Sequence, residues 1–429
     1  MSVSLQILIF TSLLIVVSKL MGGLAARLGL PVVLGELLAG VLLGPTAIDV
    51  WGYSWFSHTG PPGTSLALPA LIRILAEMGV VVLMFLAGLE TDVSLMRKTV
   101  SPALWTAIGG VIVPLAAATY FCHWVGFALS VSLFIGTILT ATSVSITAQT
   151  LMQLGQLQSL AGSTILGAAV IDDVLGLIVL SLVVALLRPA SAFGGWEHTT
   201  ALTLGRLTVF CVLTFAIGPR LVRWIFRQTR RLQAHHAPVA MGLALAFGFA
   251  FIAQYFGGLA AITGAYLVGL FTAATSAQKD IVADLRSITN SFFGPLFFVS
   301  VGLEVNVWKI SGGIGVFFLV LAIAVFGKIF GCGLGSWLKG FGLRDACVIG
   351  IGMVPRGEVG LIAASLGWEQ KLISTEIYSL CVVLVLITTL ITPAALRLFH
   401  PSMPFSPSRA QIEVEPDIAH VPVEGDSFR

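Results

Sequence analysis

Long apolar runs, separated by short polar segments, recur along nearly the whole chain. A membrane-spanning helix needs about 20 consecutive apolar residues. By that measure the pattern predicts about thirteen membrane helices and an all-α polytopic fold. The runs lie near residues 4–20, 31–44, 67–90, 101–123, 128–151, 160–187, 201–224, 237–256, 258–275, 284–303, 311–337, 344–366 and 373–398. The second run is short and rich in glycine, which predicts a broken or tilted helix.

Basic residues are distributed unequally between the loops, and this predicts the orientation of the chain. Cytoplasmic loops of membrane proteins collect Lys and Arg. The loops after odd-numbered runs hold Arg27, Arg97, Lys98, Arg227, Arg230, Arg231, Lys279, Lys339 and Arg344, and those after even-numbered runs hold Arg188, Lys309 and Lys371. We therefore expect the N-terminus outside and the C-terminus in the cytoplasm. An odd number of helices requires such opposite ends.

Two pairs of motifs indicate an internal repeat. The segment FLAGLETD (85–92) resembles FVSVGLEVN (298–306), and LGELLAG (34–40) resembles TGAYLVG (263–269). Each pair is seven helices apart, and because seven is odd the two copies must insert with opposite topology. Inverted repeats of this kind are typical of secondary transporters. The alternative is chance similarity among glycine- and leucine-rich helices.

Composition narrows the class of protein further. Of the 429 residues, 57% are apolar and 10% charged, whereas a soluble domain carries about 25% charged residues. This composition therefore suits a lipid bilayer rather than water. A net charge of +3 gives no reason to expect a nucleic-acid partner. The five cysteines are scattered without metal-ligand spacing, so we interpret them as buried apolar residues. We expect no enzyme domain, no cofactor and no nucleotide-binding domain. Residues 401–429 predict a disordered cytoplasmic tail.

Two adjacent carboxylates, Asp172 and Asp173, lie inside the apolar run 160–187. A charged residue at the centre of a membrane helix costs about 3 kcal/mol on insertion scales, so a functional site is the default interpretation. Neighbours on a helix point about 100° apart, which predicts different roles for the two. Repulsion between close carboxylates favours protonation of one of them. Such a group can bind a proton or a hard cation in turn.

Lys328 lies in the middle of another apolar run, VFGKIFGCGLGSW (325–337). About nine residues separate it from the end of that run, which argues against a side chain that reaches the membrane surface. We predict that Lys328 pairs with one of the two aspartates or carries a proton.

A helix break is predicted in GMVPRGEVGLI (352–362), because Pro355 lacks an amide donor and Gly357 loosens the chain. Irregular backbone at membrane depth is tolerated only inside protein or beside water. Arg356 and Glu358 lie at the break, and we expect them to pair with each other or with the site. Both are thus placed to compensate charge at this point.

The repeat extends this break to a second helix. Aligning the two GLE motifs carries TATSV (140–144) onto VPRGE (354–358), so two broken helices are predicted to cross. Thr142 and Ser143 offer oxygens for a dehydrated cation, although hydroxyls in membrane helices also bond to their own backbone. We interpret Glu90, Asp92 and Glu304 as capping, loop or hinge residues. The basic cluster from Arg220 to His236 is interpreted as an anchor on the cytoplasmic side, with pH sensing by its two histidines as an alternative. Glu36 stays unassigned.

These motifs resemble the monovalent cation:proton antiporter-2 family, in particular its NapA-like sodium/proton antiporters. The resemblance spans nearly all of residues 1–400 and rests on LGELLAGVLLGP (34–45), FLAGLETD, TATSVSIT (140–147), VIDDVLGL (170–177), GPLFFVSVGLEVN (294–306), the Lys328 segment and PRGEVGLI (355–362). The Asp-Asp pair with a later Lys and RGEVG is its most specific part.

The resemblance implies an NhaA/NapA-like fold of thirteen helices and a homodimer. Residues 1–100 and 237–310 would form a dimer domain, 101–190 and 311–400 a moving core, and 191–236 a linker helix. Asp173 would bind sodium or a proton in turn, with Asp172, Ser143 and Thr142 beside the cation. Asp172 would pair with Lys328 until the cation enters, and Glu358 would compensate charge at the crossing. An Asp-Asp pair is similar to the electrogenic members, which move two protons per sodium.

Other functions remain open from the sequence. A potassium/proton antiporter or a potassium efflux channel of the same superfamily would use the same fold, although the potassium-efflux branch resembles Gln-Asp at this position. A pore without exchange and a carrier of organic anions are further alternatives. Lithium and potassium could replace sodium as the transported ion. The membrane is expected to be a bacterial plasma membrane or an internal energised membrane.

Overall fold

The computed structural model describes residues 3–28, 30–53, 68–187, 196–229, 236–303, 314–369 and 371–399, and within these ranges the chain is helical without strands. Eight of the helices are long and apolar enough to cross a membrane. Shorter apolar helices add to them, among them Val32–Leu43, Leu129–Ile138 and Ala261–Ala273. The all-α polytopic fold is therefore confirmed. The tail, Glu304 and most of the loop 46–66 lie outside the described residues.

The α-helices, in chain order, are α1 (Val3–Arg27), α2 (Val32–Leu43), α3 (Leu68–Glu90), α4 (Val93–Trp124), α5 (Leu129–Ile138), α6 (Val144–Gln153), α7 (Leu160–Leu187), α8 (Trp196–Thr229), α9 (Ala237–Ile252), α10 (Ala261–Ala273), α11 (Gln278–Ile288), α12 (Gly294–Leu303), α13 (Ile314–Trp337), α14 (Leu343–Gly352), α15 (Glu358–Glu369) and α16 (Thr375–Phe399). A π-helical segment, Thr289–Phe293, joins α11 to α12. Each predicted membrane segment contains at least one of these helices.

Helix α4 begins at Val93, eight residues before the predicted start of its apolar run. Asp92 explains the early start, because its carboxylate accepts hydrogen bonds from the amides of Ser94 (2.8 Å) and Leu95 (3.1 Å) and so caps the helix. Hydrogen bonds from the Ser94 hydroxyl and from these two amides hold the pKa of Asp92 below its ordinary value. The predicted capping role of Asp92 is confirmed.

Four glycines of the echoed motifs make matching contacts, which supports the inverted repeat. A Cβ added to Gly40 of α2 would lie 2.7 Å from the Cα of Gly302 in α12. A Cβ added to Gly88 of α3 would lie 3.0 Å from the Cα of Gly269 in α10. Only glycine permits such close backbones, and small residues are typical where membrane helices pack closely. The motifs thus coincide with two of the contacts that join the halves, alongside the contact of α4 with α13.

The two predicted breaks occur where the repeat places them. Helix α5 ends at Ile138 and α6 begins at Val144; α14 ends at Gly352 and α15 begins at Glu358. Both interruptions are irregular backbone over five residues, 139–143 and 353–357. Two broken, crossing helices are therefore confirmed as part of the fold.

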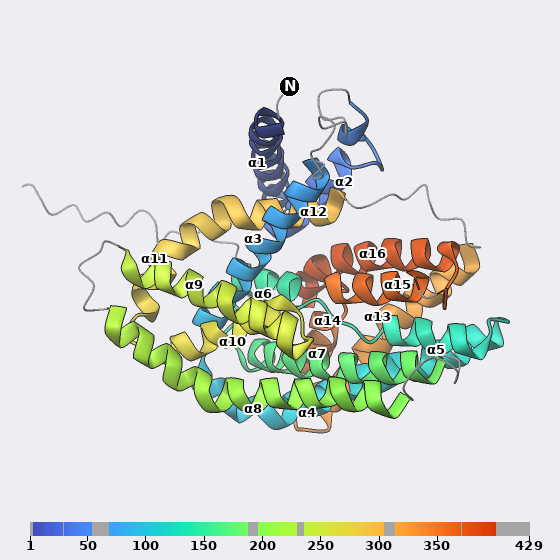
Figure 1. Ribbon diagram of the computed structural model, residues 1–429. Coiled ribbons are helices and arrows are strands. Elements are labelled where there is room, and N and C mark those ends of the chain that lie inside the picture. The colour runs from blue at the N-terminus through green and yellow to red at the C-terminus, as the bar shows by residue number, and fades with distance from the viewer. Residues whose placement is uncertain are drawn as a thin grey trace, which may run out of the picture.

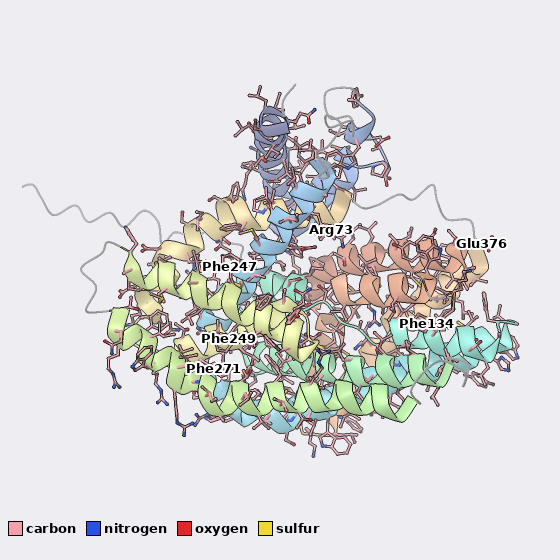
Figure 2. All side chains as sticks on the ribbon, in the orientation of Figure 1. Arg73, Phe134, Phe247, Phe249, Phe271 and Glu376 are labelled. Carbon is pink, nitrogen blue, oxygen red and sulfur yellow. The ribbon has the colours of Figure 1, made fainter. Side chains whose placement is uncertain are left out.

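The helices form two packed groups (Figure 1). In the first, α4 packs against α5, α7 and α13, and α13–α16 pack on one another; we call α4–α7 with α13–α16 the core group. In the second, α2 packs on α1 and α12, and α10 packs on α3 and α9; we call α1–α3 with α9–α12 the scaffold group. Figure 2 shows the side chains of both, with Phe249 in the scaffold group and Phe134 in the core group.

Candidate cation site

Asp172 and Lys328 form an ion pair inside the core group. The ammonium of Lys328, on α13, lies 3.0 Å from Oδ1 and 3.2 Å from Oδ2 of Asp172, on α7. Their side chains are 1% and 0% exposed. A charge buried this deeply needs a partner of opposite sign. Each of these two charges therefore stabilises the other inside the bundle.

A glycine on α4 leaves the space that the lysine head occupies. A Cβ added to Gly110 would lie 3.3 Å from Nζ of Lys328 and 2.4 Å from Sγ of Cys332. Any larger residue at position 110 would push α4 away from α13 or displace these two side chains. The ion pair thus depends on close packing between α4 and α13.

Asp173, one residue further along α7, has a different partner. Its Oδ2 accepts a hydrogen bond from the hydroxyl of Thr263, at the start of α10 in the scaffold group. Both residues are buried, with exposures of 5% and 3%. The adjacent carboxylates therefore point to different groups of helices, as the 100° step predicts. Asp172 is bound within the core group, and Asp173 is bound across the boundary between groups.

Hydrogen bonds between the two breaks hold the crossing together. The amide of Ser143 donates to the carbonyl of Pro355 (2.8 Å), and the hydroxyl of Thr147 donates to the carbonyl of Gly352 (2.6 Å). The hydroxyl of Thr142 lies 3.4 Å from the carbonyl of Met353. These bonds satisfy backbone groups that the breaks release, as buried polar groups require.

Arg356 is buried at the crossing, and its side-chain bonds differ from those the sequence suggested. Its guanidinium donates to the carbonyl of Ala141, just past the end of α5, and to the carbonyl of Ala324 in α13 (3.1 Å). A cation at the carbonyl end of a helix is stabilised by the helix dipole. These described bonds go to backbone oxygens and not to a carboxylate. Glu358 is the first residue of α15, and its side chain lies outside the described part.

Helix α7 passes close to the crossing near its aspartates. A Cβ added to Gly176 would lie 4.0 Å from the hydroxyl of Thr140, and Gly176 is about one helical turn after Asp173. Carboxylate, hydroxyl and backbone carbonyl oxygens are thus collected in one buried region. Such oxygens suit a hard monovalent cation better than a soft metal.

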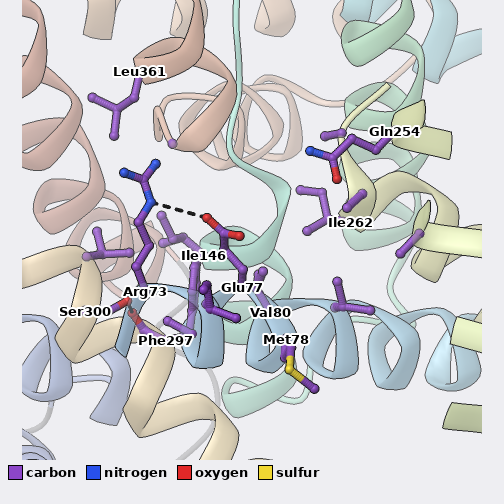
Figure 3. Close-up of a pocket in the computed structure, with 18 of the residues that line it drawn as sticks. Arg73, Glu77, Met78, Val80, Ile146, Gln254, Ile262, Phe297, Ser300 and Leu361 are labelled. Atoms are coloured by element: carbon purple, nitrogen blue, oxygen red, sulfur yellow. Dashed lines mark hydrogen bonds and ion pairs between the residues drawn. The ribbon is translucent and has the colours of Figure 1, made fainter. Parts of the chain in front are cut away.

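A cavity of about 450 Å³ lies between the two groups (Figure 3). Its scaffold side includes Arg73 and Glu77 of α3, which form an ion pair at 3.3 Å. Where the cavity approaches the crossing it is lined by Ile146, Ile262 and Gly357. Ile262 directly precedes Thr263, and Gly357 contacts Ser143. The cavity therefore approaches Thr263 and Ser143 of the candidate site from one side.

On another part of the boundary, hydrogen bonds join the two groups. Oε1 of Gln153, at the end of α6, accepts from the amide of Val33 in α2 (3.4 Å). Nε2 of Gln149 donates to Oδ1 of Asn290 (3.4 Å). The boundary is thus hollow beside the start of α6 and bridged by amide side chains further along it.

Sequence reasoning did not identify Thr263, although it used the motif that contains it. The available signal was a hydroxyl at the start of a short apolar helix. Glu36, left unassigned, is paired with Lys19 at 3.0 Å, and Glu90 with Arg286 at 2.5 Å. The interpretation of Glu90 as an end-of-helix residue agrees with its place in the last position of α3.

An inverted repeat, two crossing broken helices and buried charges beside them define the class of secondary active transporters. Residues 12–399 match the family model described as "Sodium/hydrogen exchanger, transmembrane", and the chain belongs to that family. The family consists of cation:proton antiporters, which are transporters and not enzymes.

Known proteins along the whole length agree with this assignment. The chain is 33% identical over 387 residues to the Na(+)/H(+)-K(+) antiporter GerN of Bacillus cereus, covering 90% of this chain and 94% of the relative. It is 33% identical to the Na(+)/H(+) antiporter of Enterococcus hirae, covering 90% and 96%. The solved sodium proton antiporter MjNhaP1 of Methanocaldococcus jannaschii has the same fold, with a TM-score of 0.65 at 15% identity and coverage of 92% and 96%.

Proposed function

We propose that this protein exchanges sodium for protons, and that Asp173 binds the two in turn. The observation that carries the proposal is the pair of buried carboxylates with unequal partners beside the crossing. Asp172 is paired with Lys328 inside the core group, and Asp173, which is bonded across the boundary between the groups, is the carboxylate proposed to receive the incoming ion. Ser143, Thr142 and Asp172 are the nearby oxygen donors proposed for sodium, and they accompany Asp173 in its site.

Movement of the core group against the scaffold group is the proposed means of alternating access. The core is assigned to residues 101–190 and 311–400, the scaffold or dimer domain to 1–100 and 237–310, and the linker helix to 191–236. A cavity on one part of the boundary and hydrogen bonds on another support this division. Secondary transporters with inverted repeats commonly alternate by rigid movement of one bundle against another.

Exchange is proposed to be electrogenic, with two protons per sodium and a NapA-like mechanism. When sodium binds, Asp172 turns from Lys328 toward the ion, and Lys328 releases the second proton. The buried pair supports this mechanism because the charges of Asp172 and Lys328 neutralise each other when no sodium is bound. A homodimer, an outside N-terminus, a cytoplasmic C-terminus and a bacterial plasma membrane complete the proposal.

Potassium/proton exchange is the second candidate. The name of the GerN relative includes K(+), and a 27% identical relative is the K(+)/H(+) antiporter 1 of Saccharomyces cerevisiae, of which the chain covers 44%. Oxygen donors alone do not distinguish sodium from potassium.

Reconstituted vesicles with an internal pH dye test both candidates. Sodium, lithium or potassium is added to wild-type and Asp173→Asn protein, with and without an imposed membrane potential. We expect sodium-driven proton movement that responds to the potential and falls to the level of empty vesicles in the variant. A response to potassium alone would transfer the function to potassium/proton exchange. Exchange that is unaffected by Asp173→Asn would refute the assigned site.

A further inference from the structure

Helix α10 begins without a capping side chain of its own. The residue before it is Ala260, and no side chain caps the first turn. The first amides of a helix lack partners within the helix and carry a partial positive charge. Thr263, the third residue of α10, directs its hydroxyl to the carboxylate of Asp173. The carboxylate of Asp173 is thus held next to the positive end of a scaffold helix.

The repeat-related helix α2 begins in a similar way. Pro31 precedes it and provides no side-chain cap. There the core residue Gln153 supplies the missing acceptor, to the amide of Val33. Both short scaffold helices therefore begin against an oxygen atom of a core side chain.

We propose that Thr263 is a member of the cation site, contributed by the scaffold. This inference rests on the proposed function, because it takes Asp173 as the ion-binding carboxylate. A hydroxyl has one donor and two acceptor lone pairs. It donates to Asp173 when the carboxylate is empty and ionised, and it turns a lone pair to sodium when the ion enters. In a buried site neither role is readily taken over by bulk water.

The consequence is that sodium and protons compete differently on the two sides of the membrane. Thr263 belongs to the scaffold and Asp173 to the core, so their contact exists only while the core occupies a position like this one. Asp172 and Lys328 bind each other within the core, and Arg356 binds backbone carbonyls of the core. Among the described bonds, the one from Thr263 joins Asp173 to the scaffold, and it therefore distinguishes one access state from the other.

Thr263→Val and Thr263→Ser in the full chain test this inference. Apparent KM for sodium is measured in oriented vesicles, with sodium supplied from each side at fixed pH. We expect Thr263→Val to raise KM about tenfold on one side only, the size of a hydrogen bond to a charged group, and to displace the pH profile on that side to more alkaline values. The rise in KM should exceed any change in the maximal rate. Thr263→Ser keeps the hydroxyl and should restore both values.

Other results would overturn the inference. A KM unchanged in Thr263→Val, or raised equally on both sides, would reduce Thr263 to a structural residue, as would a Thr263→Ser variant as impaired as Thr263→Val. Thr263→Ala carries the same test if the valine variant does not fold. Asp173→Asn separates the two hypotheses, because exchange that survives in it refutes the proposed function. Exchange lost in Asp173→Asn but unaltered in Thr263→Val refutes this inference alone.

Discussion

Asp172 and Asp173 are chemically identical neighbours whose surroundings give them different tasks. The first is bonded twice to a buried ammonium, and the second meets a neutral hydroxyl. A carboxylate that is paired with a cation gains less from an incoming cation than one that is bonded to a neutral hydroxyl. The proposed division of roles follows from these partners rather than from the position of either residue along α7.

Lys328→Met tests the electrostatic dependence of the pair. The substitution leaves Asp172 buried without its cation, and removal of one partner of a buried pair costs about 3–5 kcal/mol. We expect a lower melting temperature in detergent. The double variant Lys328→Met, Asp172→Asn should recover much of the loss, because it removes both charges. A double variant no more stable than the single one would show that packing around Lys328, and not charge, sets the loss.

At the scale of elements, the broken helices cross closely enough that one glycine cannot gain a side chain. A Cβ added to Gly357 would lie 2.5 Å from Oγ and 2.6 Å from Cβ of Ser143. The same glycine borders the cavity. One turn further along α15, a Cβ added to Gly360 would find its nearest neighbour at 3.7 Å, an ordinary contact.

Gly357→Ala should therefore displace Ser143 and the crossing, whereas Gly360→Ala should not. Overpacking of this kind costs about 1–3 kcal/mol, and we expect vesicle exchange to fall at least tenfold because the proposed sodium ligands move. Exchange by the Gly360→Ala control should stay near wild type. Equal activity of the two variants would show that the crossing has more room than these contacts allow.

The sequence predicted the elements better than their contacts. The breaks could be located because Pro355 and Gly357 are local signals and the repeat transfers the break to TATSV (140–144), within one residue of the interruption at 139–143. The predicted start of α4 was too late, because the first turns after the cap at Asp92 are polar and a hydropathy criterion leaves them out of the helix. Thr263 could not be assigned, since its partner lies ninety positions away and only the packing of α10 against the core brings them together. Arg356 likewise found carbonyl partners that tertiary structure alone creates.

The whole molecule is divided by a boundary that the proposed movement must shear. Nε2 of Gln149 in the core lies 3.4 Å from Oδ1 of Asn290 in the scaffold. The hydroxyls of Thr99 and Ser163, in contrast, lie 3.2 Å apart within the core, on α4 and α7. The two pairs have similar separations, but the first crosses the boundary and the second lies within the core.

Paired cysteines at these positions test the movement. In a background without the five native cysteines, a short bifunctional thiol reagent should stop exchange by Gln149→Cys, Asn290→Cys protein, and reduction should restore it. The same reagent should leave the Thr99→Cys, Ser163→Cys control active, because both residues move together. Inhibition of both pairs, or of neither despite complete linkage, would contradict rigid movement of the core against the scaffold.

The glycine contacts between the halves also constrain how the protein is made. Gly88 contacts Gly269, and Gly40 contacts Gly302. The packing partners of α2 and α3 are therefore synthesised much later than α2 and α3 themselves. Helices inserted one at a time must therefore remain in the bilayer with unfilled grooves until the ribosome has passed residue 302. A chain released between α7 and α10 would hold both aspartates, yet lack the surfaces of α10 and α12 that pack against α3 and α2.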